Sequence, residues 1–238
     1  MVRGTTVVPS AALGLAAVWC GPGLAAHWPA LARALALPRR LQPASGVALT
    51  FDDGPHPEGT PAVLGALERA EASATFFLVG EQVERYPWLA AEIVAAGHEP
   101  AVHGYRHRNQ MRVGPRSLAA DLRRSVEVIG EACGRAPRLY RPPYGAFSPV
   151  GLALVRRMSL EPLLWSEWGR DWRANTSADE IAALATGGLT PGSVILLHDA
   201  DWYSSPGSHR RTAAALPAIL AELERRGLQP IAAGRRWM

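Results

Sequence analysis

The chain has 238 residues, a length that suits one large domain or two small ones, and we expect a single domain. Hydrophobic residues make up 48% of the sequence and charged residues 19%, a balance that excludes a largely disordered chain. The net charge of +4 comes from 25 basic residues, all of them arginine, against 21 acidic ones. These arginines are scattered or paired on predicted helix faces, so we expect no nucleic-acid partner.

Cysteine usage limits the kinds of site that the chain can build. The two cysteines, Cys20 and Cys133, lie in unrelated contexts. They supply neither a framework of several disulfides nor the thiolates of a structural zinc site. Any metal must therefore be held by histidine and carboxylate, and nothing in the sequence predicts an obligate protein partner.

Residues 1–45 form an apolar N-terminal segment and a linker that precede the domain predicted at residues 46–238. Arg3, the apolar residues 7–20 and the small residues around 23–26 resemble a secretory signal, which would place the protein outside the cell or in its envelope. A membrane-spanning helix needs about 20 uninterrupted apolar residues, so Pro9 and Pro22 favour a signal or a helix lying on the membrane surface instead. The alternative is a segment at 28–37 that packs on the fold. Without a cleaved signal at residues 1–26, we expect a cytoplasmic protein.

From Gly46 onward, strand patterns alternate with helix patterns. The predicted strands are Val47–Phe51, Ala74–Val79, Glu99–Val102, Leu139–Arg141, Glu161–Trp165, Val194–His198 and Leu228–Ile231. The predicted helices are Pro61–Ala70, Gln82–Ala96, Leu118–Cys133, Pro149–Met158, Ala178–Thr186 and Arg211–Arg226. Such alternation predicts an α/β fold with about seven parallel strands, arranged as a complete or incomplete (β/α) barrel. In these barrels the active site lies at the carboxyl ends of the strands.

The first predicted strand ends in two adjacent carboxylates, Asp52 and Asp53, and a Gly-Pro turn follows them. Neighbouring strand residues point to opposite sides, so both carboxylates face one site only if the strand breaks into a loop here. Two buried carboxylates repel each other unless a cation or strong donors lie between them. The alternative is an exposed Asp-Asp-Gly turn without chemistry.

His103 and His107 follow the third predicted strand, four residues apart, a spacing from which both imidazoles reach one ion. Together with Asp53 they provide three ligands and leave a coordination position for water, as in catalytic metal sites. The alternative is a pair of surface histidines on a polar loop. Other predicted strands are also followed by reactive side chains, and this coincidence predicts a single centre. These side chains are Arg141 and Tyr144, Asp171 and Trp172, and His198 and Asp199.

Asp52 lies beside a predicted ligand without being needed as one, so we expect it to act as the general base. Arg141 would keep Asp52 ionised and oriented through a bidentate pair. His198 has three interpretations: a third histidine ligand, a buried core histidine, or the general acid for the leaving group. We favour the acid, with Asp171 holding its imidazolium in place.

The stretch from about residue 46 to 231 resembles the polysaccharide deacetylase family, carbohydrate esterase family 4. Five short blocks, specific in their order and spacing, carry the likeness. They are Thr50-Phe51-Asp52-Asp53-Gly54-Pro55, His103-Gly104-Tyr105-Arg106-His107, Arg141-Pro142-Pro143-Tyr144-Gly145, Asp171-Trp172 and Leu196-Leu197-His198-Asp199.

The resemblance implies a distorted (β/α) barrel that removes N-acetyl groups from N-acetylglucosamine-containing glycans such as chitin oligomers or peptidoglycan. It also leaves open O-acetyl removal from acetylated xylan, or a relative that binds carbohydrate without catalysis. It implies one divalent ion, zinc or a similar ion such as cobalt, which activates a water. It implies that Asp53, His103 and His107 bind the ion. Asp52 would be the base, tuned by Arg141, and His198 the acid, tuned by Asp171. The Tyr144 backbone amide would contact the oxyanion, and Trp172 and Leu196 would line the acetyl pocket.

One residue departs from the family pattern. Gly104 stands where the family often has serine or threonine after the first histidine, and loss of that hydroxyl could loosen the loop. The remaining histidines, His27, His56, His98 and His209, have no assigned role. We expect the aromatic residues Trp165, Trp168, Trp202 and Tyr203 to pack around the same rim, or to stack on a sugar face.

Overall fold

The computed structural model describes residues 22–42 and 46–234. These residues contain an eight-stranded parallel sheet with the order β5-β4-β3-β2-β1-β7-β6, and β8 pairs with the start of β1. The strands are β1 (Val47–Asp52), β2 (Thr75–Leu78), β3 (Glu99–Val102), β4 (Leu139–Tyr140), β5 (Glu161–Pro162), β6 (Glu167–Trp168), β7 (Val194–His198) and β8 (Pro230–Ile231). The helices are α2 (Pro29–Ala34), α3 (Gly59–Arg69), α4 (Gly80–Arg85), α5 (Pro87–Ala95), α6 (Pro115–Cys133), α7 (Pro149–Arg157), α8 (Ala178–Thr186) and α9 (Ser208–Arg225), with single 3-10 turns η1 (Gln110–Arg112) and η2 (Pro143–Gly145).

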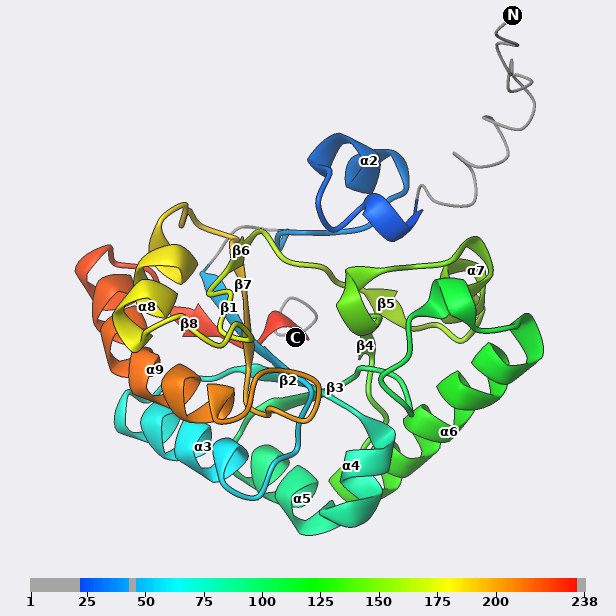
Figure 1. Cartoon of the computed structure of the whole chain (residues 1–238), viewed down its shortest axis with the longest axis horizontal. Helices are drawn as coiled ribbons and strands as arrows, with labels where there is room; N and C mark the ends of the chain where they lie inside the picture. Colours follow the sequence, from blue (N-terminus) through cyan, green and yellow to red (C-terminus); the bar gives the residue numbers. More distant parts are fainter. Residues whose placement is uncertain (1–21, 43–45, 235–238) are drawn as a thin grey trace, which may run out of the picture.

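The sheet curls, and helices α3 to α9 surround it on the outside (Figure 1). Strands β5 and β6 stand at the two ends of the strand order, so the barrel stays open between them. This arrangement confirms the predicted single α/β domain with a distorted (β/α) barrel.

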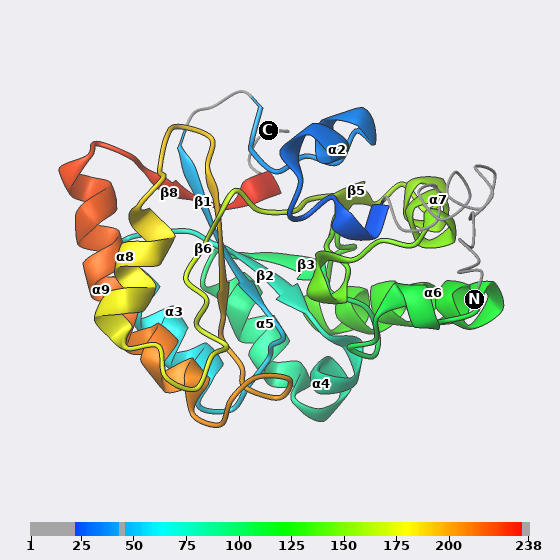
Figure 2. The ribbon, with the colours of Figure 1, turned by 45° about the horizontal axis from the view of Figure 1, so that its top comes forward.

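The chain before β1 covers the opening. Helix α2 lies over the side of the barrel where β5 and β6 end the sheet (Figure 2). The backbone N–H of Leu164 donates to the carbonyl of Pro38 across 2.8 Å, and Leu37 is 2% exposed. Ala32 and Leu37 of the stretch 28–37 are buried against the fold, whereas the signal predicted for residues 1–26 falls largely outside the described residues. Among the described helices, none has the length and apolarity needed to cross a bilayer.

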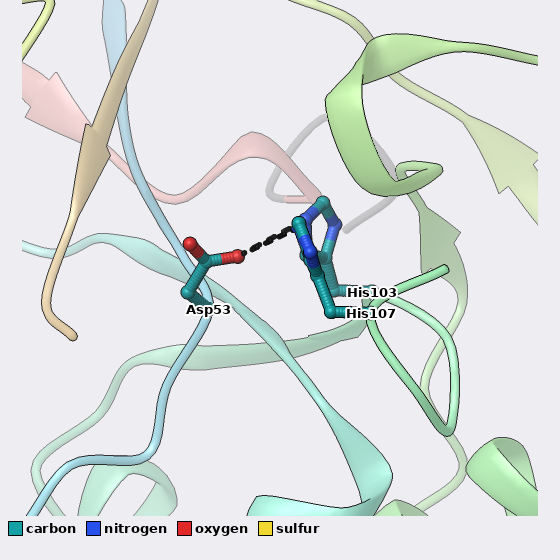
Figure 3. A group of neighbouring side chains, drawn as sticks. All are labelled: Asp53, His103 and His107. Carbon is teal, nitrogen blue, oxygen red and sulfur yellow. Dashed lines mark ion pairs between the residues drawn. The ribbon is translucent and has the colours of Figure 1, made fainter. Parts of the chain in front are cut away.

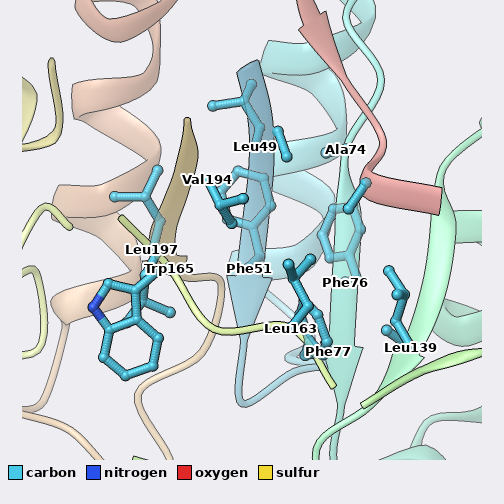
Figure 4. Packing of buried hydrophobic residues seen from close by; sticks show 14 of the residues in the cluster. Leu49, Phe51, Ala74, Phe76, Phe77, Leu139, Leu163, Trp165, Val194 and Leu197 are labelled. Carbon is cyan, nitrogen blue, oxygen red and sulfur yellow. The ribbon is translucent and has the colours of Figure 1, made fainter. Parts of the chain in front are cut away.

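Strand β1 lies at the centre of the sheet, between β2 and β7, which explains its continuous apolar sequence. Every residue of β1 is buried, as expected for a parallel strand covered on both faces. The rings of Phe51 and Phe76 stack across β1 and β2 with centroids 5.1 Å apart (Figure 4). Burying each such side chain contributes about 1.5–3 kcal/mol, so this core fixes the strands whose ends carry the site.

Two predicted elements differ from the structure. The helix predicted over Gln82–Ala96 is broken into α4 and α5, because Pro87 disfavours the helical conformation at Tyr86, which has φ −133° and ψ 57°. The strand predicted over Glu161–Trp165 ends at Pro162, and the chain then crosses the opening to form β6, which we did not predict. The carbonyls of Leu163 and Leu164 bond to the Arg141 side chain, so this stretch does not continue the ladder.

Candidate active site

The reactive residues meet at the carboxyl ends of adjacent strands. The strand register places Asp52 of β1 beside His198 of β7. His103 and Arg141 enter the same end because their N–H groups bond to Leu78 and Val102, at 2.8 and 3.0 Å. Asp52, His103 and His198 line one cavity of about 280 Å³, as do Asp53 and His107. The coincidence expected from the sequence is therefore found in space.

The two adjacent carboxylates both face this cavity because the strand breaks between them. Asp52 is the last residue of β1, and Asp53 takes a left-handed backbone conformation with φ 78°. Such a conformation is uncommon for residues other than glycine. Asp52 Oδ2 and Asp53 Oδ1 lie 3.7 and 3.4 Å from the Nε2 atom of His103, and both residues are at most 3% exposed. The interpretation as an exposed turn without chemistry is therefore wrong.

The donor set at Asp53 fits a cation. Asp53 points toward the rings of His103 and His107 (Figure 3). The His103 Nδ1–H donates to the carbonyl oxygen of Arg141 across 2.9 Å, because a carbonyl can only accept. In the neutral ring the Nε2 atom then carries a lone pair, and it faces Asp53 Oδ1, a buried oxygen without a hydrogen-bond partner. Two acceptors that face each other call for a positive charge between them.

Charge states at the three ligands also suit metal binding. Burial alone would raise the pKa of Asp53, but the close approach of the His103 ring and the charges of the neighbouring histidines lower it to about 2. Burial lowers the pKa of His107 to about 4, against the opposing effect of Asp53, so its ring is neutral at pH 7. The Nε2 atom of His107 lies 3.2 Å from Asp53 Oδ1. A carboxylate and imidazole nitrogens with a free lone pair are the ligand forms that zinc requires.

The loop that carries the two histidines is a tight loop without helical structure, and it does not need a hydroxyl at position 104. Gly104 has φ 87°, a conformation that favours glycine, and its carbonyl accepts from the Gly80 N–H across 2.9 Å. The Asp121 carboxylate accepts from the Tyr105 N–H at 2.9 Å and from Arg108 Nη2 at 2.6 Å. These bonds fix the loop from α6.

Arg141 is fully buried and pairs with Asp52. Its Nη1 donates to Asp52 Oδ1 across 2.6 Å and to Thr50 Oγ1 across 2.9 Å. Its Nε and Nη2 donate to the carbonyls of Leu163 and Leu164. The predicted bidentate pair is therefore wrong, because only Nη1 bonds to Asp52. The other guanidinium nitrogens bond to the chain segment that crosses the barrel opening. The predicted pairing of Arg141 with Asp52 is confirmed.

His198 and Asp171 form a second buried pair. The Asp171 carboxylate bonds to both the Nδ1 and the backbone N–H of His198, at 2.9 and 2.7 Å, and also accepts from Thr212 Oγ1. Burial would lower the pKa of His198, but the charge of Asp171 and its hydrogen bond raise it to about 10. The ring is therefore a cation at neutral pH, as a general acid requires. Its Nε2 lies 4.0 Å from Asp53 Oδ2, on the side of that carboxylate away from His103 and His107.

The residues expected at the acetyl pocket and oxyanion contact line the same cavity. Leu196 is two residues before His198 on β7 and so shares its face. The Trp172 ring meets the His198 ring edge-on, with centroids 5.6 Å apart. Tyr144 has φ 61°, and its ring contacts His107 at 4.7 Å. All three side chains line the cavity, and their roles stay predictions.

Two residues of the cavity wall had no predicted catalytic role. Tyr203, expected among the aromatic residues of the rim, stacks on the His107 ring at 4.2 Å, and its hydroxyl donates to Glu81 Oε1 across 2.8 Å. His27 also lines the cavity, near Trp168, although it lies far from every block that pointed to the site.

A second group of ligand-type side chains, His56, Asp201 and His209, lies within 4.8 Å but does not suit a metal. The Nδ1 of His56 accepts from the N–H groups of Glu58 and Gly59, at 3.2 and 3.0 Å. Because Nδ1 accepts, the proton of the neutral ring sits on Nε2, 3.3 Å from Asp201 Oδ1. A nitrogen that carries a proton has no lone pair for an ion. The group caps the start of α3 and ties it to α9.

Comparison with known proteins agrees with this geometry. A family model described as polysaccharide deacetylase matches residues 40–163, more than half of the chain. The chain belongs to the polysaccharide deacetylase family. A chitooligosaccharide deacetylase of Azorhizobium caulinodans is 35% identical over 202 residues, which cover 81% of this chain and 96% of that protein. A peptidoglycan-N-acetylglucosamine deacetylase of Bacillus cereus is 36% identical over 182 residues, covering 76% of this chain and 64% of that one.

Solved members of the polysaccharide deacetylase family share the fold. A crystal structure of a peptidoglycan N-acetylglucosamine deacetylase superposes with a TM-score of 0.76 at 32% identity, covering 82% of this chain and 89% of that one. The family 4 carbohydrate esterase from Streptomyces lividans, solved with acetate, gives 0.70 at 32% identity over 78% and 91% of the two chains. The predicted enzyme class, a hydrolase of carbon-nitrogen bonds other than peptide bonds, is confirmed by these relatives.

Proposed function

We propose that this enzyme removes N-acetyl groups from N-acetylglucosamine-containing glycans, such as chitin oligomers or peptidoglycan. One observation carries the proposal. The Asp53, His103 and His107 ligand atoms converge in one cavity, with a carboxylate on one side and a protonated histidine on the other. An amide hydrolase needs these parts: a group that activates water, a base, and an acid for the departing nitrogen.

Asp53, His103 and His107 would hold one divalent ion, and two nitrogens with one oxygen favour zinc, with cobalt or a similar ion as an alternative. When bound, the ion would polarise the acetyl carbonyl and lower the pKa of a water. Its site is accessible to substrate because the ligands line the open cavity.

Asp52 would accept the proton of the attacking water. Its Oδ1 is taken by the guanidinium of Arg141, so its Oδ2 is the oxygen left for the proton. The bond from Arg141 would hold the carboxylate in one orientation. The backbone N–H of Tyr144 would donate to the oxyanion. Tyr144 has a left-handed backbone conformation and lines the cavity.

His198 would give its proton to the leaving amine from Nε2. Its Nδ1 is held by Asp171, so the proton available for transfer lies on the nitrogen that faces the cavity. Trp172 and Leu196 would enclose the acetyl methyl group beside this nitrogen, because both residues line the cavity and contact His198 or share its face. Asp171 thus orients the acid while the apolar pair positions the group to be removed.

The test is a side-by-side assay of chitin oligomers, peptidoglycan fragments and acetylated xylan, with acetate release as the readout. We expect turnover of the N-acetylated glycans and loss of at least about a hundredfold in kcat for Asp52→Asn. Turnover of xylan alone would assign the enzyme to O-acetyl removal instead. Absence of turnover on all three, with the metal loaded, would contradict the proposal.

We also propose that the enzyme acts outside the cell or in its envelope, because the relatives include peptidoglycan deacetylases. Fractionation of cells that express the full chain tests this directly. The mature N-terminus, determined by mass spectrometry, reports whether a signal has been removed. A protein found only in the cytoplasm would favour small N-acetylated sugars as substrates.

A further inference from the structure

The segment that precedes the matched family domain is a folded part of this protein. The family match begins at residue 40, whereas the structure describes the chain from residue 22. Four residues before the match are at most 2% exposed and belong to the main core, Ala25, Ala26, Ala32 and Leu37, and so does Leu41 at its start. The Leu41 N–H donates to the Gly192 carbonyl across 2.8 Å and ties the segment to the start of β7.

This segment also packs against the loop proposed to bind the oxyanion. A Cβ placed on Gly145 would lie 2.8 Å from the Cβ of Ala26 and 2.5 Å from the ring of Trp165. Ala26 and Trp165 therefore fill the space beside Gly145, directly after Tyr144 in the chain. The position of Ala26 carries the next residue, His27, to the mouth of the cavity.

A row of rings connects this segment to the proposed acid. The His27 and Trp168 centroids are 5.6 Å apart, those of Trp168 and Trp172 are 5.4 Å apart, and those of Trp172 and His198 are 5.6 Å apart. All four residues line the same cavity. His27, at one end of the row, is exposed, whereas Trp168, Trp172 and His198 are partly buried.

We propose that His27 and Trp168 form a sugar-binding wall of the active site, so that residues 22–41 are a component of the site. This inference rests on the proposed function. The acetyl group would enter the buried end of the row, where Leu196 is 4% exposed. The sugar ring that carries the acetyl group is too polar for that end and lies at the exposed rim, where the flat rings of His27 and Trp168 meet its apolar face.

The experiment compares two substrates, the tetramer of N-acetylglucosamine and 4-nitrophenyl acetate, which has an acetyl group but no sugar. For His27→Ala we expect KM for the tetramer to rise about three- to tenfold, since the ring stacking is lost. We expect kcat on the tetramer and turnover of 4-nitrophenyl acetate to stay at the wild-type level. His27→Phe retains a flat ring and should retain the wild-type KM.

Trp28→Ala is the matched control, because Trp28 is the next residue, is aromatic and 60% exposed, and does not line the cavity. It should leave KM unchanged, and the thermal midpoint of each variant checks that the segment is still folded. A wild-type KM for His27→Ala would overturn the inference, as would an equal loss on both substrates, which would mean that His27 only supports the site. Failure of the wild type on every glycan would instead remove the proposed function, and this wall with it.

Discussion

Replacement of Arg141 by methionine gives the sharpest test of how the site is held together. The side chain is fully buried and makes four hydrogen bonds, of which the one to Asp52 Oδ1 is the shortest at 2.6 Å. Arg141→Met fills much of the volume but leaves the Asp52 carboxylate, 3% exposed, without its cation. Removing one partner of a buried ion pair costs about 3–5 kcal/mol. Against a typical unfolding free energy of about 5–15 kcal/mol, this is a large fraction.

The assay is urea unfolding followed by circular dichroism, with the free energy compared at a constant m value. The double variant Asp52→Asn/Arg141→Met carries neither charge, so we expect it to be more stable than Arg141→Met alone. Arg210→Met is the matched control, because Arg210 forms an equally short pair with Glu58, at 2.7 Å, but on the exposed surface, and it should unfold close to the wild type. A loss below about 1 kcal/mol for Arg141→Met, or a double variant no more stable than the single one, would refute the reasoning.

Three further predictions concern charge, metal and the second histidine group. His198 can give a proton to the leaving amine only while its ring is protonated, so activity should be present below its pKa and lost as the pH rises through it. Asp171→Asn removes the charge that raises this pKa and should move the basic limb of the pH-rate profile to lower pH. His103→Ala should reduce the metal content measured by mass spectrometry from one ion per chain to a small fraction, and chelation of the wild type should abolish turnover that zinc restores. His56→Ala should leave the metal content unchanged while it lowers the unfolding free energy by about 1 kcal/mol, because α3 loses its cap.

Much of the site could be predicted because its residues lie at recognisable strand ends. The apolar run of β1 predicts a buried strand, so the two carboxylates at its end pointed to a site, although the alternative of an exposed turn fell only when the structure showed both to be buried. His103 likewise follows a short apolar strand, and parallel strands deliver their carboxyl ends to one edge. These local patterns were enough to place the proposed base and the ligands in one cavity.

Other features depend on contacts that no local pattern reports. The turn of the chain after Pro162 follows from the Arg141 guanidinium, which bonds the carbonyls of Leu163 and Leu164 from a distant strand end. His27 reaches the cavity only because Ala26 fits against Gly145, a contact across more than a hundred residues. The break between α4 and α5 is different, because Pro87 marks it in the sequence itself.

Arg141 contributes to the centre through two separate parts of one residue. Its guanidinium fixes the proposed base Asp52, while its backbone carbonyl fixes which nitrogen of His103 carries the proton. Both the acceptor of the water proton and the lone pair for the ion are therefore set from a single point on the chain. A displacement of this peptide unit by an ångström would disturb the proposed proton transfer and the proposed ion binding together, so the two functions cannot be lost separately by moving the Arg141 backbone.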